Sequence, residues 1–188
     1  CVNYEANGDV LKSNGGTLRN RGYYFKEGIT CSGRSSSKGV SYRWYPDNHI
    51  FDVGATGLVP INGTDIYYGV AFMNSKISTY IINCFNPTVN TTEGDLKRIP
   101  YVLPNSEVSD FVSKLSQQSI SIKKYFLRYS VIEKEFTVSP LLFDRDSDTR
   151  SNVKDYFSFE NQLLSQTIIN EAISNEKIFE VYDLKESD

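Results

Sequence analysis

The stretch Tyr42–Gly54 constrains the fold more than any other part of the chain, because it has the pattern of a β-hairpin. Two runs of aromatic and β-branched residues flank the turn sequence Pro46-Asp47-Asn48. Such residues favour extended backbone, and proline presets φ for a type I turn. Aromatic runs also precede and follow this stretch, at 22–26 and 65–72. The pattern therefore predicts consecutive antiparallel strands of a small curved sheet.

The rest of the first half continues the strand pattern. The segments 66–73 and 77–85 are apolar and aromatic, and turn residues separate them. The 13 Tyr and 11 Phe among 188 residues also favour strands. Strands separated by short turns predict a meander that curls into a barrel or half-barrel.

Beyond residue 100 the pattern becomes partly helical. Asn105 or Ser106 can cap a helix, and apolar residues follow at helical spacing, namely Val108, Phe111, Val112 and Leu115. Residues 157–173 predict a second helix, with a strand as the alternative, and the runs 120–129 and 177–184 predict strands. We therefore expect a β-dominated α+β fold: a small antiparallel curved sheet or partial barrel with one or two packing helices.

The expected organisation is a tether followed by one domain. Residues 1–16 are polar and rich in Asn-Gly pairs, which predicts a loose N-terminal tether. Residues 17–188 are long enough for a single β-rich domain with its own core. Within it, 17–100 forms the strand meander and 101–188 the helix-containing second half.

The three cysteines suggest an exported protein. The chain begins at Cys1, as a bacterial lipoprotein does once its signal peptide has been removed, and in that case Cys1 carries the lipid. Cys31 and Cys84 both lie in the strand-rich half, and a disulfide between them would use the remaining thiols. The alternatives are a trimmed domain whose boundary falls on Cys1, and two buried free thiols.

A family resemblance points the same way. The sequences Gly22-Tyr23-Tyr24, Tyr42-Arg43-Trp44-Tyr45-Pro46-Asp47 and Tyr67-Tyr68-Gly69-Val70 resemble the small lipocalin-like β-domains of bacterial lipoproteins. The resemblance covers residues 22–85. Asn48 stands where those domains have Gly, and Trp44 where they have Phe. The resemblance implies a β-barrel fold and a binding role, without specifying a ligand.

The aromatic side chains are the candidate binding residues. Neighbouring Tyr residues in a strand point to opposite faces, so one of each pair leaves the core. Tyr and Trp provide rigid contact area for apolar or sugar-like ligands. We expect the ligand-binding set to be Tyr24, Tyr42, Trp44 and Tyr67; ordinary strand packing of these rings is the alternative.

The sequence offers little for catalysis or metal binding. His49 is the one histidine, and no nucleophile motif or phosphate-binding loop is present. Asp144, Asp146 and Asp148 alternate as in a calcium loop, but Thr149 stands where that loop needs Gly, so a solvated loop is favoured. No cofactor is expected. The net charge of −3 disfavours a nucleic-acid partner.

These observations predict a non-enzymatic, exported lipoprotein of the bacterial cell envelope. It would be anchored to the outer membrane only through a lipid on Cys1, and its aromatic sheet would bind a small ligand or an envelope protein. One alternative is a hydrolase that uses carboxylates such as Asp47, Asp52 or Asp144. Another is a eukaryotic secreted glycoprotein, because Asn62-Gly63-Thr64 and Asn90-Thr91-Thr92 are glycosylation sequons.

Overall fold

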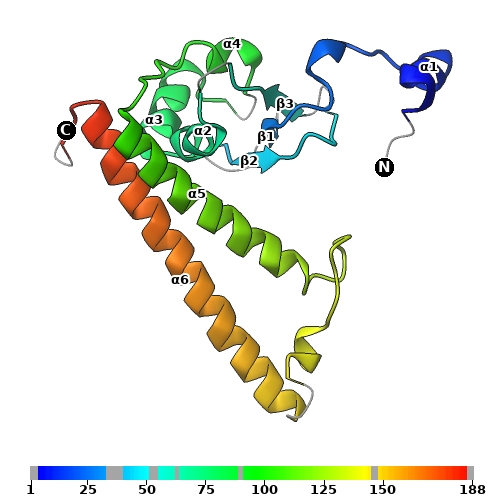
Figure 1. Cartoon of the computed structure of the whole chain (residues 1–188), viewed down its shortest axis with the longest axis vertical. Coiled ribbons are helices and arrows are strands. Elements are labelled where there is room, and N and C mark those ends of the chain that lie inside the picture. Colours follow the sequence, from blue (N-terminus) through cyan, green and yellow to red (C-terminus); the bar gives the residue numbers. More distant parts are fainter. Residues whose placement is uncertain are drawn as a thin grey trace.

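The computed structural model describes residues 4–32, 40–50, 55–61, 64–88, 91–144 and 148–185. Within these ranges the chain is helix-dominated (Figure 1). Its elements are α1 (Glu5–Ser13), β1 (Gly28–Ser32), β2 (Tyr42–Tyr45), β3 (Ala55–Leu58), α2 (Ile66–Met73), α3 (Lys76–Phe85), α4 (Glu93–Leu96), α5 (Ser106–Leu127) and α6 (Thr149–Val181), with 3-10 turns η1 (Arg21–Tyr23) and η2 (Pro140–Leu142). The prediction of a β-dominated fold is therefore wrong.

The sheet has three short antiparallel strands in the order β2-β1-β3. Ile29 in the central strand pairs with Trp44 on one side and Leu58 on the other. The strand expected before the Pro46 turn is present as β2, but its partner is β1 and not the segment after the turn. Of that segment, Ile50 lies outside any strand, and 51–54 lie outside the described residues.

Helix α2 covers one face of the sheet and forms the centre of the core. Its side chains Tyr68 and Phe72 are each only 1% exposed. A Cβ atom on Gly69 would lie 3.1 Å from the Cδ1 atom of Ile29. The absence of a side chain at Gly69 therefore lets the helix approach β1 closely.

The segments predicted as strands at 66–73 and 77–85 are instead α2 and α3, so both predictions are wrong. Each helix begins at a polar cap. The Asp65 carboxylate accepts hydrogen bonds from the amides of Tyr67 and Tyr68, and the Ser75 hydroxyl accepts one from the amide of Ser78. These bonds satisfy amides that a helix N-terminus leaves without partners. Burial of α2 on nearly all sides removes the polar positions that would have revealed its helical period.

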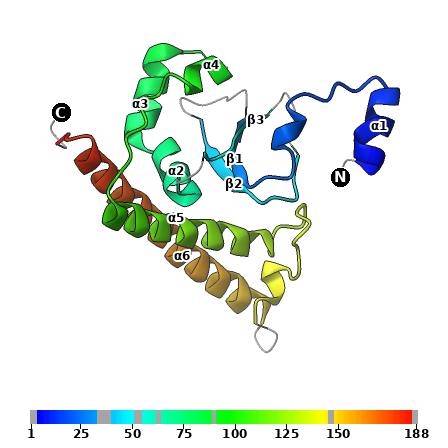
Figure 2. The ribbon, with the colours of Figure 1, turned by 45° about the horizontal axis from the view of Figure 1, so that its top comes forward.

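The two longest helices, α5 and α6, form an antiparallel arm below the sheet (Figures 1 and 2). The predicted start of α5 is confirmed: the Asn105 side chain caps it by accepting a hydrogen bond from the amide of Val108. The helix predicted over 157–173 is also confirmed, as part of α6. The predicted strands at 120–129 and 177–184 are wrong, because α5 continues to Leu127 and α6 to Val181.

The arm meets the core where α5 begins and α6 ends, and α5 also contacts it farther along through Ile120 and Lys124. At the first of these places, Val112 on α5 and Ile178 on α6 are fully buried. Farther along, the helices pack on each other through an aromatic cluster, which we define as Tyr125, Tyr129, Phe143, Tyr156 and Phe159, with ring centroids 5.1–6.0 Å apart. Stacked and edge-on rings at such distances stabilise the contact beyond their area of burial.

The N-terminal segment predicted as a loose tether contains α1. Of all the helices that the structure describes, none has the length and apolar character needed to cross a bilayer.

Candidate functional site

The most distinctive polar arrangement surrounds Trp44 on β2. The indole N–H donates a hydrogen bond to the Glu27 carboxylate, with 2.5 Å between Nε1 and Oε1. The ammonium of Lys124, an exposed residue of α5, lies 3.8 Å from the centroid of the Trp44 ring. A cation over an exposed aromatic face contributes only about 0.5–1 kcal/mol. The ring is therefore held at its edge by a carboxylate and covered on one face by a weakly bound cation.

Tyr67 joins this arrangement from the first turn of α2. Burial raises the pKa of its hydroxyl, and the neighbouring Glu27 carboxylate, to which the hydroxyl donates a hydrogen bond, raises that pKa further. Glu27 thus accepts hydrogen bonds from two aromatic side chains that lie on different elements. Of the predicted binding residues, Trp44 and Tyr67 are brought together, and Glu27 links them.

The other two predicted binding residues are placed differently. Tyr42 is 4% exposed and packs in the core. Its backbone amide and carbonyl both bond to the side chain of Asn74, at 2.9 Å each, which ties β2 to the end of α2. Tyr24 lies edge-on to Tyr4 in the N-terminal segment, with ring centroids 5.8 Å apart.

Lys124 belongs to a polar stripe along the exposed face of α5. We call Lys114, Gln117, Ser121, Lys124 and Arg128 the α5 stripe. Their spacing of three and four residues places them on one side of the helix, and all five are exposed. From Phe111 to Ile132 the chain carries four cations and no carboxylate. At 1.5 Å per residue the stripe is about 21 Å long.

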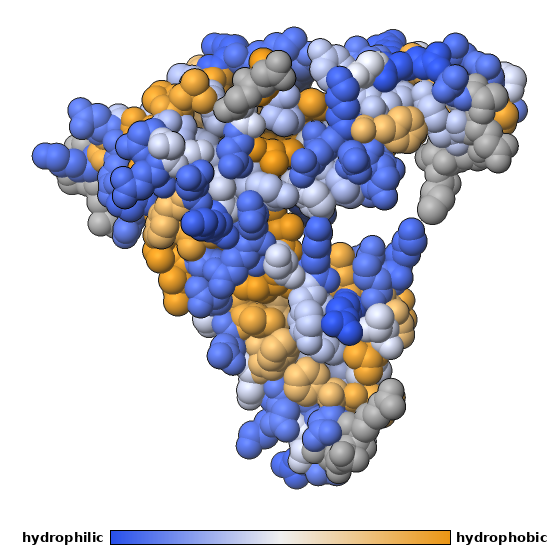
Figure 3. Space-filling model, in the orientation of Figure 1, coloured by the Kyte–Doolittle hydropathy of each residue, from blue (hydrophilic) through white to orange (hydrophobic). Residues whose placement is uncertain are grey.

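The molecule is open beside the arm. Figure 3 shows the molecule hollowed between its N-terminal part and the far end of the arm, with hydrophilic side chains projecting toward the hollow. Arg128 is partly engaged, because its Nε atom lies 3.4 Å from the Thr137 hydroxyl. The stripe therefore presents positive charge at an accessible surface, which is the arrangement that binds phosphate groups.

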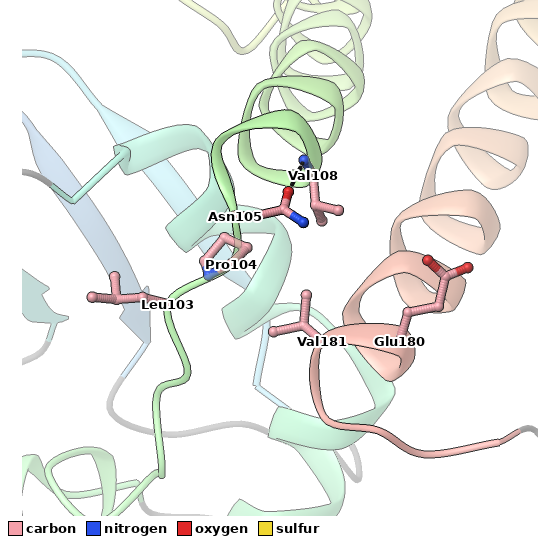
Figure 4. A pocket seen from close by; sticks show the side chains of 6 residues that line it. All are labelled: Leu103, Pro104, Asn105, Val108, Glu180 and Val181. Atoms are coloured by element: carbon pink, nitrogen blue, oxygen red, sulfur yellow. Dashed lines mark hydrogen bonds between the residues drawn. The ribbon is translucent and has the colours of Figure 1, made fainter.

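A pocket between the N-terminal end of α5 and the C-terminal end of α6 is a weaker candidate (Figure 4). It has a volume of about 300 Å³ and is lined mainly by apolar side chains, together with Asn105 and Glu180. Both polar groups already have structural partners. Asn105 caps α5, and the Glu180 carboxylate binds the Lys177 ammonium, with both oxygens 2.8 Å from Nζ. The pocket therefore offers few uncommitted polar groups to orient a ligand.

The cysteine predictions have separate outcomes. Cys31 and Cys84 are both free, so the predicted disulfide is not formed in this structure. Cys31 is buried in β1, and burial raises the pKa of its thiol, whereas Cys84 is exposed on α3. Their positions on the inner face of the sheet and on the outer face of a helix explain why they do not meet. Cys1 lies outside the described residues.

The carboxylates proposed for metal binding or hydrolysis have other roles or lie outside the description. Asp148 caps α6, and hydrogen bonds from the hydroxyl and amide of Ser151 hold the pKa of its carboxyl below the usual range. The amide of Asp144 donates a hydrogen bond to the Asn152 side chain. Among the described residues there is no group of three or more metal-ligating side chains. Asp47 and His49 are exposed.

Four further residues with predicted roles, Asp52, Asn62, Asn90 and Asp146, lie outside the described residues.

Two components of the Trp44 arrangement have no local signal in the sequence. Glu27 stands alone between two aromatic runs, and no local pattern marks it as a hydrogen-bond acceptor for Trp44. Lys124 is 80 residues from Trp44 in the sequence, so their contact depends on the fold. The charge bias of residues 111–132 is visible in the sequence, but the net charge of the whole chain conceals it.

The comparisons with known proteins change the functional interpretation. No protein-family model matches the chain. The chain is 31% identical, over 186 residues and 98% of its length, to the adenine-specific methyltransferase BrxX of Escherichia coli O9:H4 (strain HS). It is 26% identical, over 113 residues and 56% of its length, to the adenine-specific methyltransferase PglX of Lacticaseibacillus casei (strain Zhang). The matches cover only 15% and 9% of these relatives.

The predictions of a lipocalin-like domain and of a non-enzymatic cell-envelope lipoprotein are therefore wrong. The short aromatic strands that suggested a barrel form a three-stranded sheet under a helix. The similarity points to enzymes, and nothing in the fold or the comparisons supports a lipoprotein, a β-barrel or a cell-envelope role. The chain is similar, over nearly its whole length, to a short part of one adenine-specific methyltransferase and, over 56% of its length, to a short part of another.

Proposed function

We propose that this chain serves an adenine-specific methyltransferase as a segment that holds the nucleic acid, and that the α5 stripe contacts the phosphate backbone. The observation that carries the proposal is the 31% identity over 98% of the chain to a protein of that name. Because the match covers only 15% of that relative, we assign this chain one part of the relative's function, and not the whole of it.

The chemistry of adenine methylation explains why a holding segment is needed. An enzyme that modifies a base inside a duplex must extrude that base from the stack, which costs a few kcal/mol. Contacts to the phosphates on either side offset this cost and set the register of the protein on the strand. Lysine, arginine and amide side chains make most of these contacts, and the α5 stripe contains all three types.

The dimensions of the stripe suit this role. Phosphates of one strand recur every 3.4 Å along the axis of B-DNA, so a stripe of about 21 Å spans roughly six of them. Helix α2 packs on one side of α5, and α6 packs along another side. The stripe thus lies on a supported helix, which limits the entropy lost when a polyanion binds.

The proposal opposes the expectation from net charge that no nucleic acid binds. That expectation treats the charge as evenly distributed along the chain. Phosphates respond to charge within about a Debye length, which is close to 10 Å at 0.1 M salt. At that range the cations between Phe111 and Ile132 matter more than the distant acidic residues. A binding assay decides between the two.

The test measures the salt dependence of binding to a fluorescently labelled 20-base-pair duplex that contains adenine, by fluorescence anisotropy. The binding variant is Lys114→Gln/Lys124→Gln/Arg128→Gln. The matched control, Lys12→Gln/Lys76→Gln/Lys154→Gln, removes three exposed positive charges that lie off the stripe.

If three stripe cations contact phosphates, the slope of log K against log salt becomes shallower by about 2.7 in the binding variant, because each contact contributes about 0.9. The control variant keeps nearly the wild-type slope. Equal slopes in the two triple variants, or no salt-dependent binding by the wild type, would contradict the proposal.

A further inference from the structure

The environment of Trp44 has a feature that phosphate binding does not use. One side of the indole packs against the core cluster formed by the sheet and α2. The Lys124 ammonium lies over the ring, and Lys124 itself is exposed; we call the ring face under Lys124 the outer face. The bond from Nε1 to Glu27 fixes the orientation of the ring. Trp44 is therefore an aromatic plane whose orientation is fixed at its edge and whose outer face has an exposed, flexible lysine side chain over it.

Lys124 connects this plane to the α5 stripe. In the free protein its cation lies against the aromatic ring. A phosphate bound along the stripe attracts the same cation, because a full negative charge is a stronger partner than a ring quadrupole. When the Lys124 side chain turns toward a phosphate, it leaves the outer face of Trp44 open beside the strand to which that phosphate belongs.

We propose that the outer face of Trp44 is a stacking platform for an unpaired base of the bound nucleic acid, and that Lys124 covers it until a phosphate draws the cation away. The proposal rests on the proposed function and extends it by naming the part of the substrate that Trp44 contacts. Stacking is tolerant of sequence because every base has a flat π face. Bases of a single strand, or a base displaced from a duplex, satisfy the requirement.

Glu27 and Tyr67 favour a base with an amino group. The Glu27 carboxylate accepts hydrogen bonds from Trp44 and from Tyr67, and a carboxylate has about four lone-pair sites for acceptance. A remaining site can accept the exocyclic N–H of an adenine that lies over the ring. A carboxylate also repels phosphate, so the strand is expected to pass on the Lys124 side with its base turned inward.

The test compares two single-stranded probes of equal length and charge, oligodeoxyadenylate and an abasic deoxyribose-phosphate strand. Trp44 is the one tryptophan of the chain, so its fluorescence reports on this site alone. The adenine strand should quench the emission strongly and bind about tenfold tighter than the abasic strand, since stacking one base on an aromatic side chain accounts for roughly a 5- to 150-fold change in affinity.

Variants locate the effect. Trp44→Leu should abolish the preference for the adenine strand and leave the affinity for the abasic strand unchanged, as measured by anisotropy of labelled probes. Trp44→Phe, with a smaller ring, should retain part of the preference and guards against loss of folding. Tyr80→Leu is the matched control, because Tyr80 is an aromatic residue 71% exposed on α3. Lys124→Gln should weaken both strands while keeping the preference.

The outcomes separate the two proposals. Equal binding of the two strands by the wild type, without quenching by the adenine strand, overturns the stacking platform but leaves phosphate binding intact. Failure of both strands and of the duplex to bind overturns the proposed function. A preference for the adenine strand that survives in Trp44→Leu shows that the base is recognised elsewhere and overturns the inference.

Discussion

The hydroxyl of Tyr68 allows a stability prediction whose sign is unexpected. Tyr68 on α2 is 1% exposed, and its hydroxyl has no hydrogen-bond partner among the described residues. Burial raises the pKa of this hydroxyl well above its usual range. A buried polar group without a partner costs about 1–3 kcal/mol. Replacing Tyr68 with Phe removes that cost and keeps the ring, which packs edge-on to Tyr101 with centroids 6.1 Å apart.

The expected gain is smaller than the full cost, because the deleted oxygen leaves a small void. We therefore expect Tyr68→Phe to stabilise the protein by about 1 kcal/mol, which raises the Tm by about 2–4 °C for a chain of this size. Thermal unfolding followed by far-UV circular dichroism measures the shift. Urea unfolding with an unchanged m-value would show that the gain does not come from a more compact unfolded state.

Tyr182 provides the matched control. Its hydroxyl donates to the carbonyl of Pro100 and accepts from the amide of Val102, whose nitrogen lies 3.2 Å away. Tyr182→Phe makes the same chemical change but breaks real hydrogen bonds, so the Tm should fall by about 2–4 °C. If Tyr68→Phe lowered the Tm as much as Tyr182→Phe, the Tyr68 hydroxyl would have a partner and the argument from its isolation would be refuted.

Three further predictions concern pH, a hydrogen-bonded link and the root of the arm. Burial raises the pKa of Tyr101 to about 12, against about 10 in the unfolded chain. The contribution of Tyr101 to stability is therefore complete below about pH 10 and declines as pH rises toward 12. Between about pH 8 and 11 the urea midpoint should fall less in Tyr101→Phe than in the wild type. Asn74→Asp removes the amide donor that bonds to the carbonyls of Tyr42 and Val70. It should lower the free energy of unfolding in urea by about 2 kcal/mol. An unchanged urea midpoint would contradict the role of Asn74 as a link between β2 and α2. Ile178→Ala should lower the free energy of unfolding by about 2–5 kcal/mol, because the Ile178 side chain is fully buried. The control Ile168→Ala replaces an isoleucine that is 66% exposed on the same helix, and it should change stability by less than about 0.5 kcal/mol. Comparable losses of stability in calorimetry would show that the outer face of α6 is also covered.

The start of α5 could be predicted because its determinants are local. Asn105 lies directly before the helix, and Val108 and Val112 repeat at helical spacing. Helix α2 could not be predicted in the same way. It is eight residues long and buried on nearly every side, so Ile66, Tyr68 and their neighbours show no polar period that separates a helix from a strand. Packing against β1 and β2 outweighs their strand propensity.

The candidate site could be predicted only in part. The sequence marks Trp44 and Tyr67 as candidates because they are large aromatic residues in extended or apolar runs. Their convergence on Glu27 depends on how α2 sits on the sheet, and the contact of Trp44 with Lys124 depends on the position of α5. Contacts between distant segments leave no periodic trace in one sequence. Cys31 and Cys84 lie in one region of the sequence, but they are on different elements and both are free in this structure.

The arm of α5 and α6 has a mechanical consequence. Helix α6 has 33 residues, which makes it about 50 Å long. Its fully buried core residue Ile178 lies near one end, and Asn170, nearer the middle, bonds to Gln118 and Ser119 of α5. A rotation of only about 5° at Ile178 displaces the far end by roughly 4 Å. The arm therefore has the geometry of a lever: a change of packing beneath Ile178 that is too small to see locally would be magnified toward the Thr149 end of α6.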